Sequence, residues 1–419
     1  MHLLPLRNCW PGFLAAVIML AGCQKTTPTP TPPAAPPPAK QLDRIDDALR
    51  AAAKYLTSKQ SPDGAWRSET YGALKDGASL TPLALEALSR LDDTDAPAVE
   101  KATQYLLGMV QPDGTIDSES SGLTYPVYTA ALAVIVLSRQ GESQQKPREA
   151  WLAFLRQWQL TEELGWEEED AFYGGWGYAR HLPRKPAADQ PFPPLGEPNL
   201  SATVFALEAL RAAGAAADDP AAVKALKFVK RCQNFSGTAK QTDPLNDGGF
   251  FFVQQDWVRN KAGGPKVEEN NKQENPPFRH FYSYGSATAD GLRCLLLCGL
   301  DERHPRVAAA RKWLTDPFSP RRHPGAYAAD REHDRQSLYY YYCASAATAL
   351  QQLNVVEAPA EKGDRGFWAE ELADELLRRQ REDGSWQNAA VEVREDDPLV
   401  ATSLAIIALD ICRNVIRRR

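Results

Sequence analysis

Few side chains in this sequence are suited to metal or acid chemistry. Asp290 and Cys294 stand four residues apart in an apolar helical pattern, and Cys343 lies in a later segment of the same kind. Residues four apart share a helix face, and carboxylate and thiolate are both zinc ligands. The alternative for a Cys in such a pattern is a small buried hydrophobic residue. Neither His280 nor His333 has a second His at ligand spacing. We therefore predict no metal site and no cofactor.

Acidic side chains could also transfer protons, and Asp290 and Asp397 are the two candidates for a catalytic acid. Asp397 ends a short acidic run that begins at Glu395, and a second acidic run covers residues 167–170. We interpret both runs as solvated loop charge, as such runs usually are. The catalytic residues therefore stay unassigned, with these two aspartates as candidates.

Aromatic residues gather at or just before the starts of predicted apolar helices. Such rings could line a pocket for an apolar chain and stabilise a passing positive charge by cation–π contact. The alternative is that a wide ring of helices needs bulky side chains to fill its middle. The candidates for a cavity or its rim are Tyr125, Tyr128, Trp176, Tyr178, Tyr284, Tyr341 and Tyr342.

The elements that must position these side chains form a repeat. Each copy has a helix that ends in a large apolar residue, then a turn with glycine, then a second large apolar residue. Gln60 and Trp66 mark the turn of the first copy, and Gln380 and Trp386 mark that of the last. Copies between them keep the pattern with substitutions and two long insertions, at 161–198 and 234–280.

A second helix follows each turn and has its own signature. TPLALEAL (81–88), TVFALEAL (203–210) and TSLAIIAL (402–409) align without gaps. The positions four and seven residues after the first are almost always aliphatic, which is the spacing of a helix face. We expect the Thr hydroxyls to bond the carbonyl one turn back, a structural role. The threonines at the first position are Thr81, Thr129, Thr203, Thr288 and Thr402, and Ala346 replaces Thr in the fifth copy.

Six helix pairs of this size must stack on one another to bury their apolar faces. The second helices are more apolar and should form an inner ring, and the first helices should form an outer ring. We predict an all-α (α/α)6 barrel in one domain, residues 42–415. Both insertions precede inner helices, so they should lie at one end of the barrel.

The repeat carries a family resemblance. The runs YLTSKQSPDGAW, KALKFVKRCQ…DGGF and LLRRQREDGSW resemble the QW repeat of the squalene cyclase and prenyltransferase superfamily. YGGWGY (173–178), YGSATADGL (284–292) and LYYYYCASAATAL (338–350) resemble uncharacterised exported bacterial members. The resemblance implies an α/α toroid whose central cavity is the place where family enzymes handle isoprenoids. It also implies that the Gln and Trp of each turn are a structural brace.

The family's catalytic motifs are missing from this sequence. Neither the DxDD acid motif nor the DDxxD diphosphate motif occurs. Of the family's Asp, Cys and His zinc ligands only the Asp is matched, by Asp290. Leu292 falls at the Cys position, and Tyr342 or Cys343 falls near the His position.

The N-terminal segment predicts export. Arg7 precedes an apolar stretch, residues 13–20, and Leu20-Ala21-Gly22-Cys23 resembles the lipobox of bacterial lipoproteins. This resemblance implies cleavage after residue 22 and a lipid anchor on Cys23, the alternative being an ordinary secretory signal with a chance Cys. Residues 23–41 should be a disordered, proline-rich linker. We find no later stretch that is long and apolar enough to span a membrane.

These observations favour one function and leave a second open. The net charge of −6 is spread along the chain, which argues against nucleic acid, and an odd number of five later cysteines argues against a disulfide framework. We expect a lipoprotein anchored in the bacterial cell envelope, facing the periplasm or the surface. Its toroid should have a non-catalytic binding or scaffold role through the central cavity or the rim loops, with an isoprenoid, a peptide or a protein as ligand. The alternative is an enzyme that acts on isoprenoid-type substrates with a non-standard acid.

Overall fold

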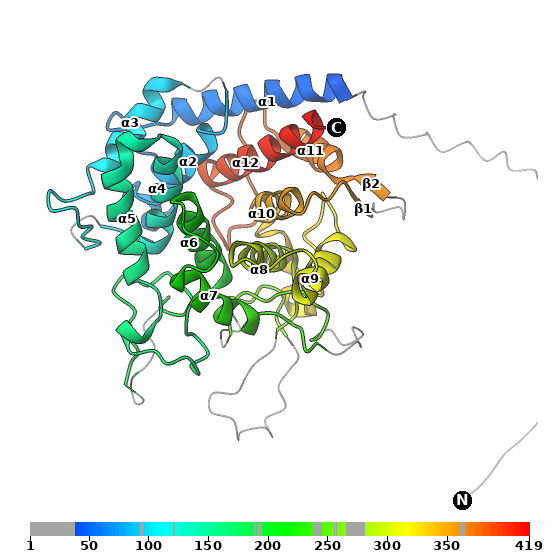
Figure 1. Ribbon diagram of the computed structural model, residues 1–419. Helices are drawn as coiled ribbons and strands as arrows, with labels where there is room; N and C mark the ends of the chain where they lie inside the picture. Colours follow the sequence, from blue (N-terminus) through cyan, green and yellow to red (C-terminus); the bar gives the residue numbers. More distant parts are fainter. Residues whose placement is uncertain are drawn as a thin grey trace, which may run out of the picture. The chain divides into compact units, whose positions relative to one another are not determined.

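In the computed structural model of the protein, helices follow one another around a common centre from Pro38 to Arg417 (Figure 1). The described residues are 38–92, 95–119, 122–187, 190, 195–237, 245–254, 256, 258–264, 281–359 and 365–419. The predicted signal peptide, Cys23 and most of the predicted linker therefore lie outside them.

The folded unit begins earlier than the sequence predicts. Helix α1 (Pro38–Ser58) includes residues 38–41, which we expected in the extended linker. Proline is tolerated in the first turn of a helix, where its missing N–H has no partner to lose. Gln41 is buried and donates from Nε2 to the carbonyl of Glu370 (3.1 Å), which fixes this turn against a helix late in the chain.

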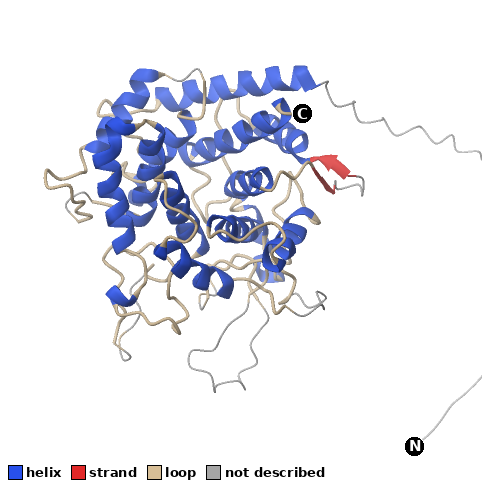
Figure 2. Ribbon diagram, in the orientation of Figure 1, coloured by secondary structure: helices blue, strands red, loops and turns tan. Residues whose placement is uncertain are grey.

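Six outer and six inner helices alternate along the described chain (Figures 1 and 2). The outer helices are α1, α3 (Ala96–Leu107), α5 (Gln145–Gln157), α7 (Pro220–Arg231), α9 (Pro305–Thr315) and α11 (Trp368–Arg379). The inner helices are α2 (Leu80–Leu88), α4 (Pro126–Arg139), α6 (Leu200–Ala212), α8 (Gly285–Leu297), α10 (Tyr339–Gln352) and α12 (Pro398–Arg417). Each inner helix packs on the next, and α12 packs on α2, so the inner ring is closed. The predicted (α/α)6 barrel is confirmed.

Shorter elements lie in the connections between these helices. The 3-10 helices are η1 (Gly72–Leu74), η2 (Glu142–Gln144), η3 (Glu162–Leu164) and η4 (Ala329–Gln336). Strands β1 (Glu357–Pro359) and β2 (Arg365–Phe367) pair antiparallel between α10 and α11 (Figure 2). They leave the twelve-helix ring unchanged.

The two rings differ in burial as the sequence pattern indicates. In α4, eleven residues from Pro126 to Leu137 are buried, whereas α11 buries only one face. Helix α12 is apolar and long enough to cross a membrane by length and composition, contrary to our expectation for the later chain. Its apolar window is 78% buried inside the protein, because α12 packs between α1, α10, α11 and α2.

A glutamine side chain links successive repeats. In four copies its amide group donates to one carbonyl in its own turn and to a second in the next outer helix, at 2.8–3.0 Å. The donors and acceptors are Gln60 with Gly64 and Ala98, Gln159 with Gly174 and Ala221, Gln233 with Gly248 and Arg306, and Gln380 with Gly384 and Ala48. Since Ala48 lies in α1, Gln380 joins the last copy to the first.

The turn aromatic and the inner-helix Thr complete this brace. The buried indoles of Trp66 and Trp386 donate to Leu56 and Leu376 carbonyls at 2.7 and 2.8 Å. The expectation for the Thr hydroxyls needs correction, because they accept from the backbone N–H of the turn aromatic. The pairs, at 3.0–3.2 Å, are Trp66 with Thr81, Trp176 with Thr203, Phe250 with Thr288 and Trp386 with Thr402. Thr129 instead lies 3.4 Å from the hydroxyl of Ser79.

The turn glycine is required by close packing. Gly384 has a φ of +84°, and a Cβ there would lie 2.6 Å from the carbonyl oxygen of Ala51. Gly64 has a φ of +91°, and a Cβ there would lie 2.3 Å from the carbonyl oxygen of Lys101. Both conditions exclude other residues. The repeat motif therefore sets the distance between neighbouring helix pairs.

Candidate functional site

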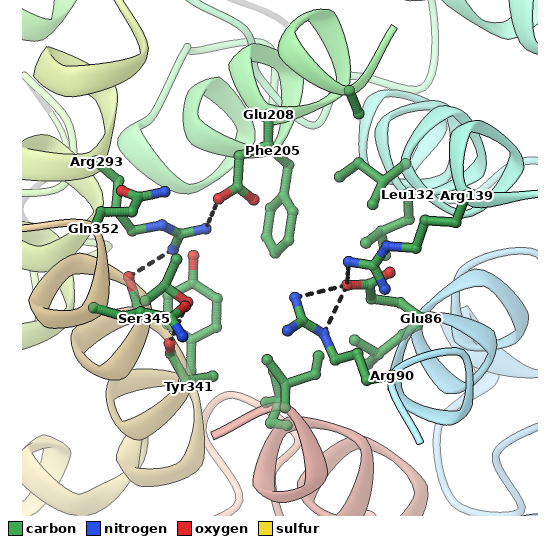
Figure 3. A pocket seen from close by; sticks show the side chains of 18 of the residues that line it. Glu86, Arg90, Leu132, Arg139, Phe205, Glu208, Arg293, Tyr341, Ser345 and Gln352 are labelled. Carbon is green, nitrogen blue, oxygen red and sulfur yellow. Dashed lines mark hydrogen bonds and ion pairs between the residues drawn. The ribbon is translucent and has the colours of Figure 1, made fainter. Parts of the chain in front are cut away.

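Among the described residues, cavities of two kinds lie inside the ring of inner helices. The tyrosine cavity, about 490 Å³, lies where the inner helices begin, and the charged cavity, about 450 Å³, lies toward their C-terminal ends (Figure 3). Four side chains line both cavities and form a waist between them: Leu83, Phe205, Tyr341 and Leu404. The toroid thus holds two chambers of different chemistry.

Aromatic rings dominate the tyrosine cavity. Five of the predicted candidates line it: Tyr125, Tyr128, Tyr178, Tyr284 and Tyr341. Tyr125 meets Tyr178 edge to face at 6.0 Å between ring centroids, and Tyr128 meets Phe205 at 5.0 Å. Burial raises the pKa of the Tyr128, Tyr178 and Tyr341 hydroxyls, so these phenols are neutral at physiological pH. The phenol and alkyl side chains suit an apolar ligand, and charged side chains also line the cavity: Arg259, Lys261, Asp290, Glu392, Arg394 and Glu395.

Two of the aromatic candidates lie elsewhere. Trp176 is the turn aromatic of the third repeat, and its indole donates to the Leu155 carbonyl at 2.8 Å. Tyr342 does not line the tyrosine cavity. Its ring stacks on that of His323, with 4.9 Å between ring centroids, and its hydroxyl lies 3.4 Å from the Ser319 carbonyl oxygen. Trp176 follows a turn, and consecutive tyrosines on α10 face different sides of the helix, so the sequence alone did not separate lining from bracing rings.

Asp290 lies in the wall of the tyrosine cavity and is 1% exposed. Its Oδ2 accepts from the Tyr341 hydroxyl at 2.8 Å, and its Oδ1 accepts from Ser345 at 2.5 Å. Arg293 lies 3.2 Å from Oδ1 and also pairs with Glu208 at 2.6 Å. Burial raises the pKa of Asp290 to about 6, against the opposing effects of Arg293, Ser345 and Tyr341. At neutral pH this carboxyl is ionised and fully engaged.

A chain of hydroxyl groups leads from the cavity to this carboxyl. The Tyr178 hydroxyl donates to Ser201 at 2.9 Å, and Ser201 lies 2.7 Å from the Tyr341 hydroxyl. Tyr341 then donates to Asp290. Such a chain can hold a proton or pass it along, and it also fixes the ring of Tyr341 at the waist.

The second acid candidate, Asp397, is a helix cap. Its side chain accepts from the backbone N–H of Leu399 at 2.9 Å, at the start of α12. The interpretation of its acidic run as solvated is wrong, since Asp397 is 3% exposed and Glu395 is 1% exposed. Asp396 accepts from the Tyr71 hydroxyl at 2.5 Å. In the other run, Glu167 and Glu168 are solvated as expected.

Glu395 is a lining residue that the sequence did not single out. Its oxygens accept from the backbone N–H groups of Tyr340 and Tyr341, at 2.9 and 2.8 Å, where α10 begins. Asn388 donates a third bond at 3.0 Å. Burial raises the pKa of Glu395 to about 7, although these three donors lower it. Its charge therefore changes near neutral pH.

We expect Glu395→Gln to remove a pH dependence of stability. The folded pKa is about 7 and the unfolded value is near 4.5, so this group contributes stability below about pH 4.5 that is lost as the pH rises through 7. Between pH 5 and 8 the wild-type free energy of unfolding should fall by about 2–3 kcal/mol relative to the variant. Urea denaturation of both proteins at each pH measures this difference. Parallel pH profiles would show that Glu395 does not titrate in this range.

Metal ligands do not converge within the described ranges. No three His, Cys, Asp or Glu side chains there could hold an ion together, and this includes Asp290, Cys294 and Cys343. The five cysteines in this part are buried and unpaired. Burial raises the pKa of the Cys294 and Cys343 thiols well above the ordinary value, so neither offers a thiolate at neutral pH.

The lumen-facing residues follow a register in the inner-helix signature. In five of the six copies its third position gives a residue that lines a cavity: Leu83, Phe205, Asp290, Thr348 and Leu404. Its sixth position, one helical turn further, gives residues of the charged cavity: Glu86, Glu208, Arg293, Gln351 and Ile407. In α4 the register is shifted by one residue, so that Leu132 and Ile135 line the charged cavity in place of Ala131 and Val134. Residues three apart share a helix face. This register is present in the aligned eight-residue signatures of the inner helices and could have predicted which residues line the cavities.

Loop residues complete the tyrosine cavity. Phe252, Arg259 and Lys261 come from the second insertion, and Leu195 comes from the first. Arg259 lies 3.3 Å from Glu197 and stacks over the Phe252 ring. The expectation that both insertions lie at one end of the barrel holds for these residues, since they meet where the inner helices begin.

Comparison with known proteins agrees with this architecture. The model of the prenyltransferase alpha-alpha toroid domain family matches residues 99–252. A curated relative, drimenyl diphosphate synthase of Streptomyces showdoensis, is 30% identical over 148 residues. That match covers 34% of this chain and 25% of the enzyme, so it spans about a quarter of the relative's length.

Solved structures show the same fold. A variant of the type II terpene cyclase MstE from Scytonema, in complex with the product merosterolic acid A, has a TM-score of 0.57 and 14% identity, covering 90% of this chain and 99% of that chain. The apo enzyme has a TM-score of 0.53 and 12% identity, covering 89% and 99%. The chain therefore contains an α/α toroid of the terpene cyclase type. The family match and the shared fold together support its assignment to the squalene cyclase and prenyltransferase superfamily.

Proposed function

We propose that this protein binds an elongated apolar ligand of isoprenoid type in the tyrosine cavity, and that binding rather than turnover is its role. The observation that carries this proposal is the cavity itself, about 490 Å³, whose lining is mostly aromatic and aliphatic with a few charged side chains from its wall and loops. That volume lies within the range of small-molecule sites, which are mostly apolar with a few placed polar groups. Superfamily resemblance supports the ligand class.

The state of Asp290 argues against alkene protonation. That reaction needs a strong acid, whereas a carboxyl with a pKa of about 6 is a weaker acid than an ordinary Asp. Both of its oxygens are occupied by hydrogen bonds or by Arg293. The DxDD motif is also missing. A binding role requires neither a strong acid nor a metal.

The proposed site of action is the bacterial cell envelope. The sequence at residues 20–23 supports a lipid anchor on Cys23, which would keep the toroid near a membrane. An apolar ligand would be available from that membrane. A peptide or protein partner at the cavity rim is the competing ligand class.

We expect Leu83→Trp to weaken ligand binding at least tenfold by filling the waist. Leu83 is 3% exposed and lines both cavities, so a larger side chain takes space that the ligand needs. Isothermal titration with geranylgeraniol measures the dissociation constant. Val223→Trp is the matched control, because Val223 is 47% exposed on outer helix α7. No binding by the wild type, or equal binding by Leu83→Trp in a protein that folds normally, would contradict the proposal.

A second candidate function is proton transfer to or from an isoprenoid-type substrate. It is favoured by the hydrogen-bonded chain from Tyr178 to Asp290 in the cavity wall. It is also favoured by the enzymes among the similar proteins. Turnover that disappears in Asp290→Asn, with ligand binding retained, would distinguish this function from binding alone.

A further inference from the structure

The charged cavity lies beyond the waist and is not used by the proposed function. Polar side chains in the last turns of the inner helices surround it, among them Ser138, Gln351 and Gln352. Three arginines also line it (Figure 3). Apolar side chains such as Leu132 and Ile135 line the rest of this chamber of about 450 Å³, so it can take a ligand that carries a charged or polar group on an apolar body.

Two of these arginines are held together by one carboxylate. Glu86 is 4% exposed, and its Oε1 accepts from Arg90 Nε at 2.9 Å and from Arg139 Nη2 at 2.7 Å. Figure 3 shows both guanidinium groups beside Glu86, and both reach into the cavity. A single anion therefore positions two cations next to each other.

Each guanidinium keeps donors for a further partner. A guanidinium has five N–H donors, and in the described part of the chain Arg139 donates only to Glu86. Arg90 has one more acidic neighbour, Asp410, at 3.8 Å. The side chains of Arg90 and Arg139 are 22% and 36% exposed. Both can therefore reach a molecule inside the cavity.

The remaining charges of the cavity are already paired. Arg293 contacts Asp290 and Glu208 on the opposite side. Glu208 itself accepts from Arg293 at 2.6 Å. Among the described residues, Arg293 Nε and Glu86 Oε2 are buried without a hydrogen-bond partner, whereas the more exposed Arg90 and Arg139 present their free donors to the cavity.

We propose that Arg90 and Arg139 form a binding site for an anionic group, a carboxylate or a phosphate. Adjacent guanidiniums recognise such groups through paired, charge-assisted hydrogen bonds. The carbonyl ends of the inner helices give this end of the ring a partial negative charge. Arg90 and Arg139 together with Glu86 carry a net charge of +1, so an anion would be held by that charge and by the N–H donors that Glu86 does not use.

The anion has two possible sources. It can be a free small anion, or it can be the head of the ligand whose apolar body lies in the tyrosine cavity. The second source follows from the waist, because Phe205 and Tyr341 line both chambers. Only this second source rests on the proposed function.

The test is calorimetric titration of the full chain with pyrophosphate, farnesol and farnesyl diphosphate. We expect pyrophosphate or farnesyl diphosphate to bind, and Arg90→Gln and Arg139→Gln to weaken that binding at least tenfold while farnesol binding is unchanged. Arg139→Lys keeps the charge beside Glu86 and should give an intermediate loss. Arg311→Gln is the control, because Arg311 pairs with Glu302 on the outer ring with a similar exposure of 40%.

The outcomes separate the two sources and the two proposals. If farnesyl diphosphate binds more tightly than both pyrophosphate and farnesol, the anion is the head group of the apolar ligand. If pyrophosphate and farnesyl diphosphate bind equally, the site takes a free small anion. Binding that is unaffected by both arginine variants, or absent for both anions, overturns the anion site. Failure of farnesol alone to bind contradicts the proposed function and leaves the pyrophosphate result intact.

Discussion

Trp386→Ala should lower the free energy of unfolding by about 3–5 kcal/mol, the range for a fully buried aromatic side chain. Trp386 is fully buried, its indole donates to Leu376 at 2.8 Å, and its backbone N–H donates to Thr402. The same turn carries Gln380, which joins the sixth repeat to α1. The variant should therefore loosen the closure of the ring, and chemical denaturation measures the loss.

Ile116→Ala is the control for this prediction. Ile116 occupies the turn position in the second repeat, where it is partly exposed, and Val110 replaces the glutamine. Its loss should cost about 1–2 kcal/mol, as for a smaller and less buried side chain. Similar losses for both variants would show that the Trp position has no special part in holding the repeats together.

Asp290→Ala should lower the free energy of unfolding by about 2–4 kcal/mol. The substitution leaves Arg293 buried with Glu208 as its remaining acidic partner, and it removes the acceptor of Tyr341 and Ser345. Breaking a buried ion pair from one side is costly because the other charge stays buried. Thermal and urea denaturation at pH 8, where Asp290 is ionised, measure this loss.

Asp290→Asn separates shape from charge. The amide keeps the size of the side chain and one oxygen acceptor, so it should cost less than Ala. Because burial raises the folded pKa of Asp290 to about 6, the protonated carboxyl contributes stability below pH 4 that is lost as the group ionises and the pH rises through 6. The wild type should therefore lose stability relative to Asp290→Asn over this range. An Ala variant as stable as the wild type at pH 8 would show that the Asp290 network is not a structural anchor.

The fold could be predicted because six copies carry the same physical constraints. The Gln, glycine and aromatic residues recur in the sequence, and each has a repeated packing role. Ring closure was also predictable, since stacked pairs with two apolar faces need neighbours on both sides. The start of α1 could not be predicted, because the proline-rich composition before Leu42 is typical of a linker. The contact that fixes this turn, from Gln41 to the carbonyl of Glu370, joins residues far apart in the sequence.

The site could be predicted only in part. The tyrosines at inner-helix starts do line a cavity, but Tyr342 lies one residue after Tyr341 and faces another way. Glu395 and Asp397 were mistaken for solvated charge, because local sequence does not show which helix N-terminus a loop carboxylate will cap. The charged cavity depends on residues from different repeats, such as Arg90 and Arg139, which meet only when the ring closes.

The most direct test of the proposed ligand is native mass spectrometry of the protein purified from its own cells. Copurifying molecules are then identified after denaturation. We predict a retained isoprenoid-type lipid in the wild type and none in Leu83→Trp, whose waist is filled. A toroid that retains a peptide or protein instead, or a lipid that Leu83→Trp retains equally, would contradict a ligand site in the tyrosine cavity.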